Sequence, residues 1–179
     1  AFAKRVILAL AGSALLLAWG AVAAASGGGD FPLFRGNQAR TGYLAQGPQP
    51  PLELRWTFKS RHGRTQIVAY PGVDDGFSTA IVAEGFVYVG SHDGRLYALE
   101  AASGKKVWEF PTAGRVVSTP VWHDGRLFFG STDNFLYALE AASGKLLWRF
   151  KSGVRQFRCI DYGGVRASPV VRDDTLYVG

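Results

Sequence analysis

The side chains that could carry chemistry lie in loops, where arginine, histidine and aspartate gather at a few places. One group follows residue 60, a second fills residues 155–162, and His92 lies in a short turn between them. Guanidinium groups bind carboxylates and phosphates, so these groups either meet an anionic ligand or partner or are solvated surface. The candidate binding face comprises Arg61, His62, Arg64, His92, Arg155, Arg158, Asp161 and Tyr162.

Metal binding and catalysis receive little support from residue spacing. His62, His92 and His123 are far apart in the chain, without the close pairing that metal sites use, so we predict no metal site and assign no catalytic residue. The acidic turns at Asp93 and Asp133 have a simpler role available as turn formers. Cys159 is the single cysteine, which excludes a disulfide within the chain and leaves a plain core or loop role as the default.

A repeat positions these loops. Residues 78–110 and 118–150 align without a gap, and residues 96–105 are identical to residues 136–145. The two copies begin at Ser78 and Ser118, 40 positions apart. A period of about 20–50 residues is typical of repeat architectures.

Each copy divides into four short apolar segments separated by turn signals. In the first copy we expect strands at residues 79–83, 86–90, 95–100 and 105–110, each ending at a glycine or an Asp-Gly type turn. Four antiparallel strands in about 40 residues make one blade of a β-propeller. A single small sheet cannot bury both faces, so we expect blades to stack through Val87, Val89, Leu96, Ala98 and Trp108. The predicted fold is all-β.

The hairpin between the third and fourth strands resembles a known motif. Residues 98–108 and 138–148 are similar to the tryptophan-docking motif of the PQQ-like (pyrroloquinoline quinone) β-propeller repeat family, Ala-x-Asp-x-x-Thr-Gly-x-x-x-Trp, with Glu and Ser replacing Asp and Thr. The resemblance covers about residues 52–179. It implies that structural tryptophan docking, and not cofactor contact, is the role of Trp56, Trp108, Trp148, Gly104 and Gly144.

The flanking segments indicate incomplete blades. Residues 52–58 alternate apolar and polar side chains as a strand does, and Trp56 to Phe58 matches the fourth strand of each copy. Residues 167–171 and 176–179 match the first two strands. We therefore expect an N-terminal fragment of about two and a half blades, from a ring of about seven or eight.

The N-terminal segment is typical of an exported protein. A basic start at Lys4 and Arg5 precedes an apolar run and small residues, which predicts a signal peptide over residues 1–25 with cleavage near Ala23 or Ala25. Without cleavage, this segment would be the only membrane contact. An irregular linker and lead-in then covers residues 26–51, and the propeller repeats cover 52–179.

The family resemblance leaves the function open between two classes. Its members include quinone-dependent dehydrogenases and scaffolds without a cofactor, of the BamB outer-membrane assembly type, and fold does not decide function. The first hypothesis is a non-catalytic exported scaffold, periplasmic or extracellular, that presents a loop face to envelope proteins or a ligand. The alternative is a PQQ-dependent alcohol or sugar dehydrogenase that binds PQQ and calcium in further blades; a ligand-sensing propeller is a third. The net charge of +6 includes no dense basic stripe, so nucleic-acid binding is not predicted.

Overall fold

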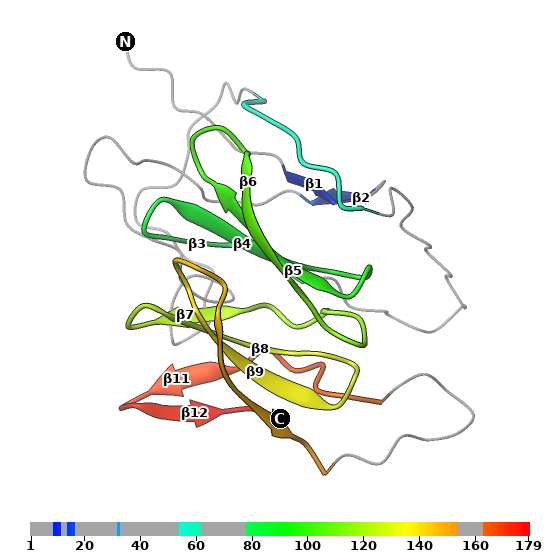
Figure 1. Cartoon of the computed structure of the whole chain (residues 1–179), viewed down its shortest axis with the longest axis vertical. Helices are drawn as coiled ribbons and strands as arrows, with labels where there is room; N and C mark the ends of the chain where they lie inside the picture. The colour runs from blue at the N-terminus through cyan, green and yellow to red at the C-terminus, as the bar shows by residue number, and fades with distance from the viewer. Residues whose placement is uncertain (1–8, 12–13, 17–31, 33–53, 62–77, 154–162) are drawn as a thin grey trace.

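The computed structural model of the chain describes residues 9–11, 14–16, 32, 54–61, 78–153 and 163–179. Within these residues every regular element is a β-strand, and the larger sheets lie one above the other (Figure 1). No helix in these described ranges has the length and apolar character to cross a membrane. The all-β prediction is confirmed.

Each copy of the repeat forms one four-stranded antiparallel sheet. The first sheet has the order β3-β4-β5-β6, from Ile81–Ala83, Phe86–Ser91, Arg95–Glu100 and Lys106–Pro111. The second sheet contains β7 to β10 in chain order, from Val121–His123, Arg126–Gly130, Phe135–Glu140 and Leu146–Lys151. Two consecutive meanders of this kind are the blades that the repeat predicts.

Two smaller sheets complete the described strands. β11 (Val170–Arg172) pairs with β12 (Thr175–Tyr177), which is the predicted half blade. β1 (Ala9–Ala11) pairs with β2 (Ala14–Leu16) inside the predicted signal peptide. The predicted cleavage site near Ala23 or Ala25 lies outside the described residues.

The hairpins between first and second strands have the same backbone form in each blade. Both residues of the turn have positive φ at Glu84-Gly85 and at Asp124-Gly125, and Asp173-Asp174 repeats this in the half blade. Two-residue turns with positive φ at both positions match the twist of antiparallel strands, and aspartate and glycine tolerate them best. Turn chemistry thus fixes the register of each inner hairpin.

The core lies between successive sheets. Leu96 and Ala98 on one face of the first blade pack with Leu127 and Phe129 of the second, with Trp108 against the same cluster. Val87 and Val89 line the opposite face beside Trp56. These are the positions that strand alternation predicts. The predicted stacking contacts are confirmed.

One predicted strand does not form. Residues 55–60 have no strand hydrogen bonding, and only Leu54 makes an isolated bridge, although the alternation over residues 52–58 predicts a strand there. A fourth strand needs a third strand beside it to pair its backbone groups. No described strand occupies that position, so the described contacts of this segment with the first blade involve a side chain on one side or both.

Candidate functional site

A tryptophan from one blade covers a glycine turn of the next at two successive junctions. The Trp108 ring lies where a Cβ on Gly144 would approach Cδ2 to 2.6 Å, and its Nε1 donates to the Ala141 carbonyl at 3.1 Å. Trp56 covers Gly104 in the same way. A Cβ on Gly104 would lie 2.4 Å from Trp56 Cδ2, and Trp56 Nε1 donates to the Ala101 carbonyl at 3.0 Å. Both glycines also have positive φ, which other residues rarely adopt. The backbone and the space beside it therefore both favour glycine at these positions.

The third copy of this tryptophan has no glycine turn beside it in the described residues. Trp148 is 42% exposed, and its ring lies against Phe128 of its own blade, with ring centroids 5.8 Å apart. Phe150, two positions later, is 63% exposed. The outer strand β10 of the second blade is therefore exposed along its whole length, whereas Trp108, Glu109 and Phe110 of the corresponding strand β6 are half-buried.

The turns between second and third strands lie on one face with the link that joins the two blades. Val116 N donates to the Ser91 carbonyl at 3.0 Å, and Thr132 N donates to the Arg115 carbonyl at 2.9 Å. Ala113 N donates to Asp133 Oδ2 at 3.0 Å. The link is thus held from both sides, beside the turn between β4 and β5 that contains the predicted binding-face residue His92.

The acidic turn residues serve the fold. Asp133 accepts from the hydroxyl of Tyr137 at 2.7 Å and from Phe135 N at 3.0 Å. Asp93 accepts from Tyr97 at 2.5 Å. Burial, together with the hydrogen bond to the carboxylate, raises the pKa of both tyrosines well above its usual range. At neutral pH each pair is a fixed donor and acceptor rather than a free acid or base.

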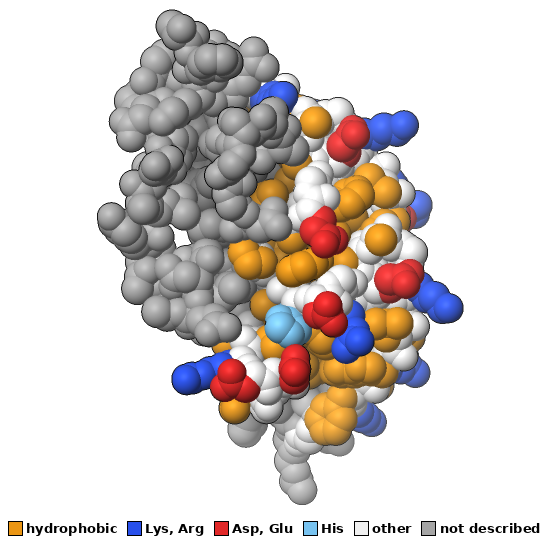
Figure 2. Space-filling view, turned by 90° about the vertical axis from the view of Figure 1, so that its left-hand side faces the viewer, with side chains coloured by type: hydrophobic (Ala, Val, Ile, Leu, Met, Phe, Trp, Pro, Cys, Tyr) orange, Lys and Arg blue, Asp and Glu red, His pale blue; other side chains and the backbone are white. Residues whose placement is uncertain are grey.

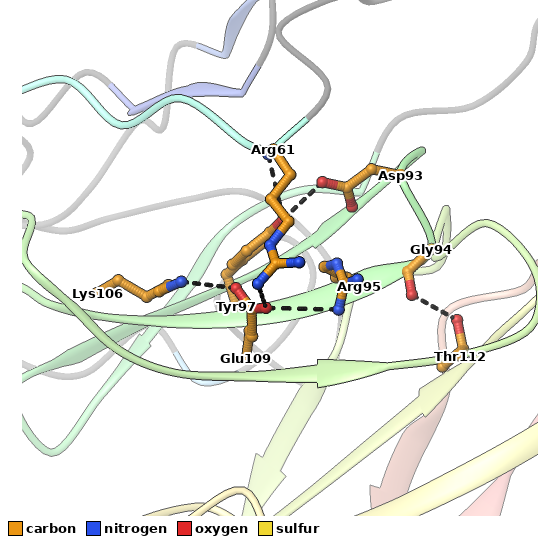
Figure 3. A network of polar contacts seen from close by, with 8 residues as sticks. All are labelled: Arg61, Asp93, Gly94, Arg95, Tyr97, Lys106, Glu109 and Thr112. Atoms are coloured by element: carbon orange, nitrogen blue, oxygen red, sulfur yellow. Dashed lines mark hydrogen bonds and ion pairs between the residues drawn. The ribbon is translucent and has the colours of Figure 1, made fainter.

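A second polar cluster, which we call the Glu109 cluster, surrounds one carboxylate on β6 (Figure 3). Lys106 Nζ lies 2.7 Å from Glu109 Oε2, while Arg61 Nη2 and Arg95 Nη1 lie 3.0 and 3.4 Å from Oε1. The hydrogen bond from Lys106, followed by the attraction of the two arginines, lowers the pKa of Glu109. The cluster therefore holds an ionised carboxylate among three cations.

Of the predicted binding-face residues, the structure describes Arg61 and His92. His92 lies in the turn between β4 and β5, and Arg61 reaches the hydroxyl of Tyr97 and the carboxylate of Glu109. Cys159 falls outside the described residues. So do the remaining predicted positions, which are His62, Arg64, Arg155, Arg158, Asp161 and Tyr162.

Sequence reasoning missed the partners of Arg61. Glu109 and Tyr97 lie inside strands that read as packing elements. A comparison of the two copies would have singled out Glu109, because the second copy has Arg149 at the equivalent position. The Asp-Tyr pair gives a different signal, since it recurs in both copies at the same spacing.

The described residues provide no obvious place for calcium or a quinone. No three metal-ligating side chains come together in the ranges the structure describes. Asp93, Asp133 and Glu109 already accept from tyrosines or cations. On the face in Figure 2, acidic and basic side chains alternate with apolar ones over the described part.

Comparison with known sequences yields one family. A family model described as "Outer membrane protein assembly factor BamB" matches residues 53–179. A search of curated proteins gives no significant match.

Three solved structures are similar to parts of this chain. BamB from Moraxella catarrhalis is 25% identical with a TM-score of 0.48, covering 57% of this chain and 30% of that one. A europium-containing methanol dehydrogenase is 20% identical with a TM-score of 0.62, covering 84% and 27%. The quinohemoprotein alcohol dehydrogenase of Comamonas testosteroni is 19% identical with a TM-score of 0.58, covering 84% and 23%. The chain therefore spans less than a third of each, and the likeness to the two dehydrogenases concerns the fold alone.

Proposed function

The chain belongs to the PQQ-like propeller family described as outer membrane protein assembly factor BamB, and from this membership we propose that it is a non-catalytic scaffold of the bacterial envelope. It is exported by its N-terminal segment, with cleavage near Ala23 or Ala25, to the periplasm or the cell exterior. Its partners are envelope proteins, which it meets through the face that carries the inserted loops.

The observation that carries this proposal is how the described acids are used. Asp93 and Asp133 hold tyrosine hydroxyls, and Glu109 holds three cations. A general acid or base needs a reacting proton within hydrogen-bond reach and a pKa near the working pH. The lowered pKa of Glu109 does not suit a general acid or a general base, and the oxygens of Asp133 already accept hydrogen bonds. They suit a rigid support instead.

Rigidity is what a scaffold requires from its fold. The tryptophans that dock on glycine turns, and the hydrogen bonds that hold the link between the blades, fix the positions from which the loop segments leave the blades. Loops on a rigid framework are where binding residues concentrate, and insertions on one face of a repeat protein often form its binding surface.

A deletion experiment tests the proposal in the bacterium. We expect cells that lack the gene to contain less folded outer-membrane protein, and the intact gene to restore it. Full-length protein mixed with PQQ and calcium should show no dye-linked oxidation of alcohols or sugars. Saturable oxidation by the purified protein, with normal outer-membrane protein in the deletion strain, would replace the scaffold with the dehydrogenase.

A further inference from the structure

The two described blade junctions have corresponding parts, and one of them carries an additional contact. Trp56 and Trp108 occupy the same place in their junctions, as do Phe58 and Phe110, so Arg61 corresponds to Ala113. Phe58 meets Tyr97 edge to face at 5.0 Å, and Phe110 meets Tyr137 in the same way at 5.6 Å. Three positions after the phenylalanine, Arg61 and Ala113 then each contact the Asp-Tyr pair of the following blade.

At the second junction this last contact is complete. Ala113 N donates to Asp133 Oδ2 at 3.0 Å, and both oxygens of that carboxylate accept hydrogen bonds. The link continues directly to the next blade, where Arg115 N donates to Thr132 Oγ1 at 2.8 Å. Main-chain donors, together with the Thr112 hydroxyl, which donates to the Gly94 carbonyl at 3.0 Å, hold this segment in place.

At the first junction the same contact is weaker. Arg61 N reaches the hydroxyl of Tyr97 at 3.4 Å instead of the carboxylate. Asp93 Oδ1 is buried and has no hydrogen-bond partner among the described residues. The link that follows is also longer, since Phe58 and Ser78 are 20 positions apart where Phe110 and Ser118 are 8 apart. A longer loop costs more entropy to close, so the main chain holds this junction less firmly.

We propose that the Glu109 cluster is a lock specific to this junction, in which Glu109 is a positioning residue that holds the segment 54–61 on the first blade through the Arg61 side chain. The guanidinium lies 3.0 Å from the carboxylate, and Lys106 and Arg95 keep that carboxylate ionised and oriented. The lock replaces the main-chain contact that Asp133 supplies at the other junction.

The second blade lacks every part of this lock. Arg149, Phe135 and Leu146 stand where the first blade has Glu109, Arg95 and Lys106. The Arg149 guanidinium instead lies 4.7 Å from the centre of the Phe135 ring. The carboxylate is replaced by a cation and two of its cationic partners by apolar residues, so the lock cannot form at the second junction. Of the two described junctions, the lock lies at the one that is followed by a long insertion.

Amide hydrogen exchange of the full chain tests the lock. Glu109→Gln should speed exchange in residues 54–61 by about two- to fivefold, the range expected for an exposed ion pair, and Arg61→Gln should leave residues 108–113 unchanged. Arg61→Gln, at a side chain that is 60% exposed, should act equally, and the double variant should add nothing further. Glu84→Gln neutralises a turn carboxylate outside the cluster and serves as the matched control.

Three results would overturn the lock. The first is unchanged exchange at residues 54–61 in both single variants. The second is an equal rise at residues 108–113 in Arg61→Gln, which would indicate general loosening. The third is additive effects in the double variant, which would mean that Arg61 and Glu109 act separately.

Discussion

Single glycines decide whether two blades can meet at all. At Gly144 a side chain would collide with the indole of Trp108, and at Gly104 with that of Trp56. The same residues have positive φ, so each is constrained twice, by the space and by the backbone. Two glycines that have the same φ but different neighbours around the Cβ position can separate the two constraints.

Gly144→Ala should destabilise the protein more than Gly125→Ala. The φ values are 71° and 70°, but nothing lies within 4 Å of a Cβ at Gly125, whereas Trp108 Cδ2 lies 2.6 Å from one at Gly144. Left-handed backbone costs alanine about 1–2 kcal/mol in both variants, and the collision adds about 1–3 kcal/mol in the first.

Urea denaturation of both variants measures the difference between these costs. Equal midpoints would mean that the tryptophan does not press on the turn, and the docking role assigned to Trp108 and Gly144 would then be wrong.

At the scale of strands, the inner edges of the blades are joined by hydroxyl groups. Thr79 N donates to Thr119 Oγ1 at 3.1 Å, and Thr119 N donates to Ser168 Oγ at 3.0 Å, so the same contact links the first blade to the second and the second to the half blade. Thr119 and Ser168, which lie just before the first strands β7 and β11, thereby offer a hydroxyl to the preceding blade. Strand alternation does not reveal this, because a buried threonine in a short strand reads as an ordinary β-residue.

Thr119→Val tests this inner contact. The substitution keeps the shape of a side chain that is 2% exposed but leaves Thr79 N without its acceptor, which should cost about 1–3 kcal/mol. Thr119→Ser keeps the acceptor and should lose much less. The free energy of unfolding checks both, and a serine variant as unstable as the valine variant would attribute the effect to the methyl group instead.

The sequence predicts the strands of each blade within one or two residues, because turn signals and alternation agree over residues 78–150. It fails at residues 55–60, where alternation is present but no neighbouring strand is, since a strand is a property of a pair. It also predicts that Arg61 belongs to the binding face, but not that Glu109 holds it. That contact joins positions far apart in the chain, and no local pattern encodes it.

At the scale of the whole molecule, the blades present two unlike faces. One carries the turns at Ser91 and Ser131 and the link between blades; the other carries the exposed turns at Lys105 and Lys145. Antiparallel strands of equal length necessarily send alternate turns to opposite ends of the sheet. Because the long insertions begin on the first face, the proposed scaffold function belongs to that face.

The most direct test is the amount of folded outer-membrane protein in cells whose only copy of the gene is a variant. The two variants each remove two positive charges. One is Arg155→Ala with Arg158→Ala, at two positions that the sequence predicts for the binding face, and the other is Lys105→Ala with Lys145→Ala, at the exposed turns of the opposite face. We predict that the first variant, expressed at the normal level, fails to restore folded outer-membrane protein, and that the second restores it fully. Equal restoration by both, or loss only in the lysine variant, would contradict the assignment of function to the loop face.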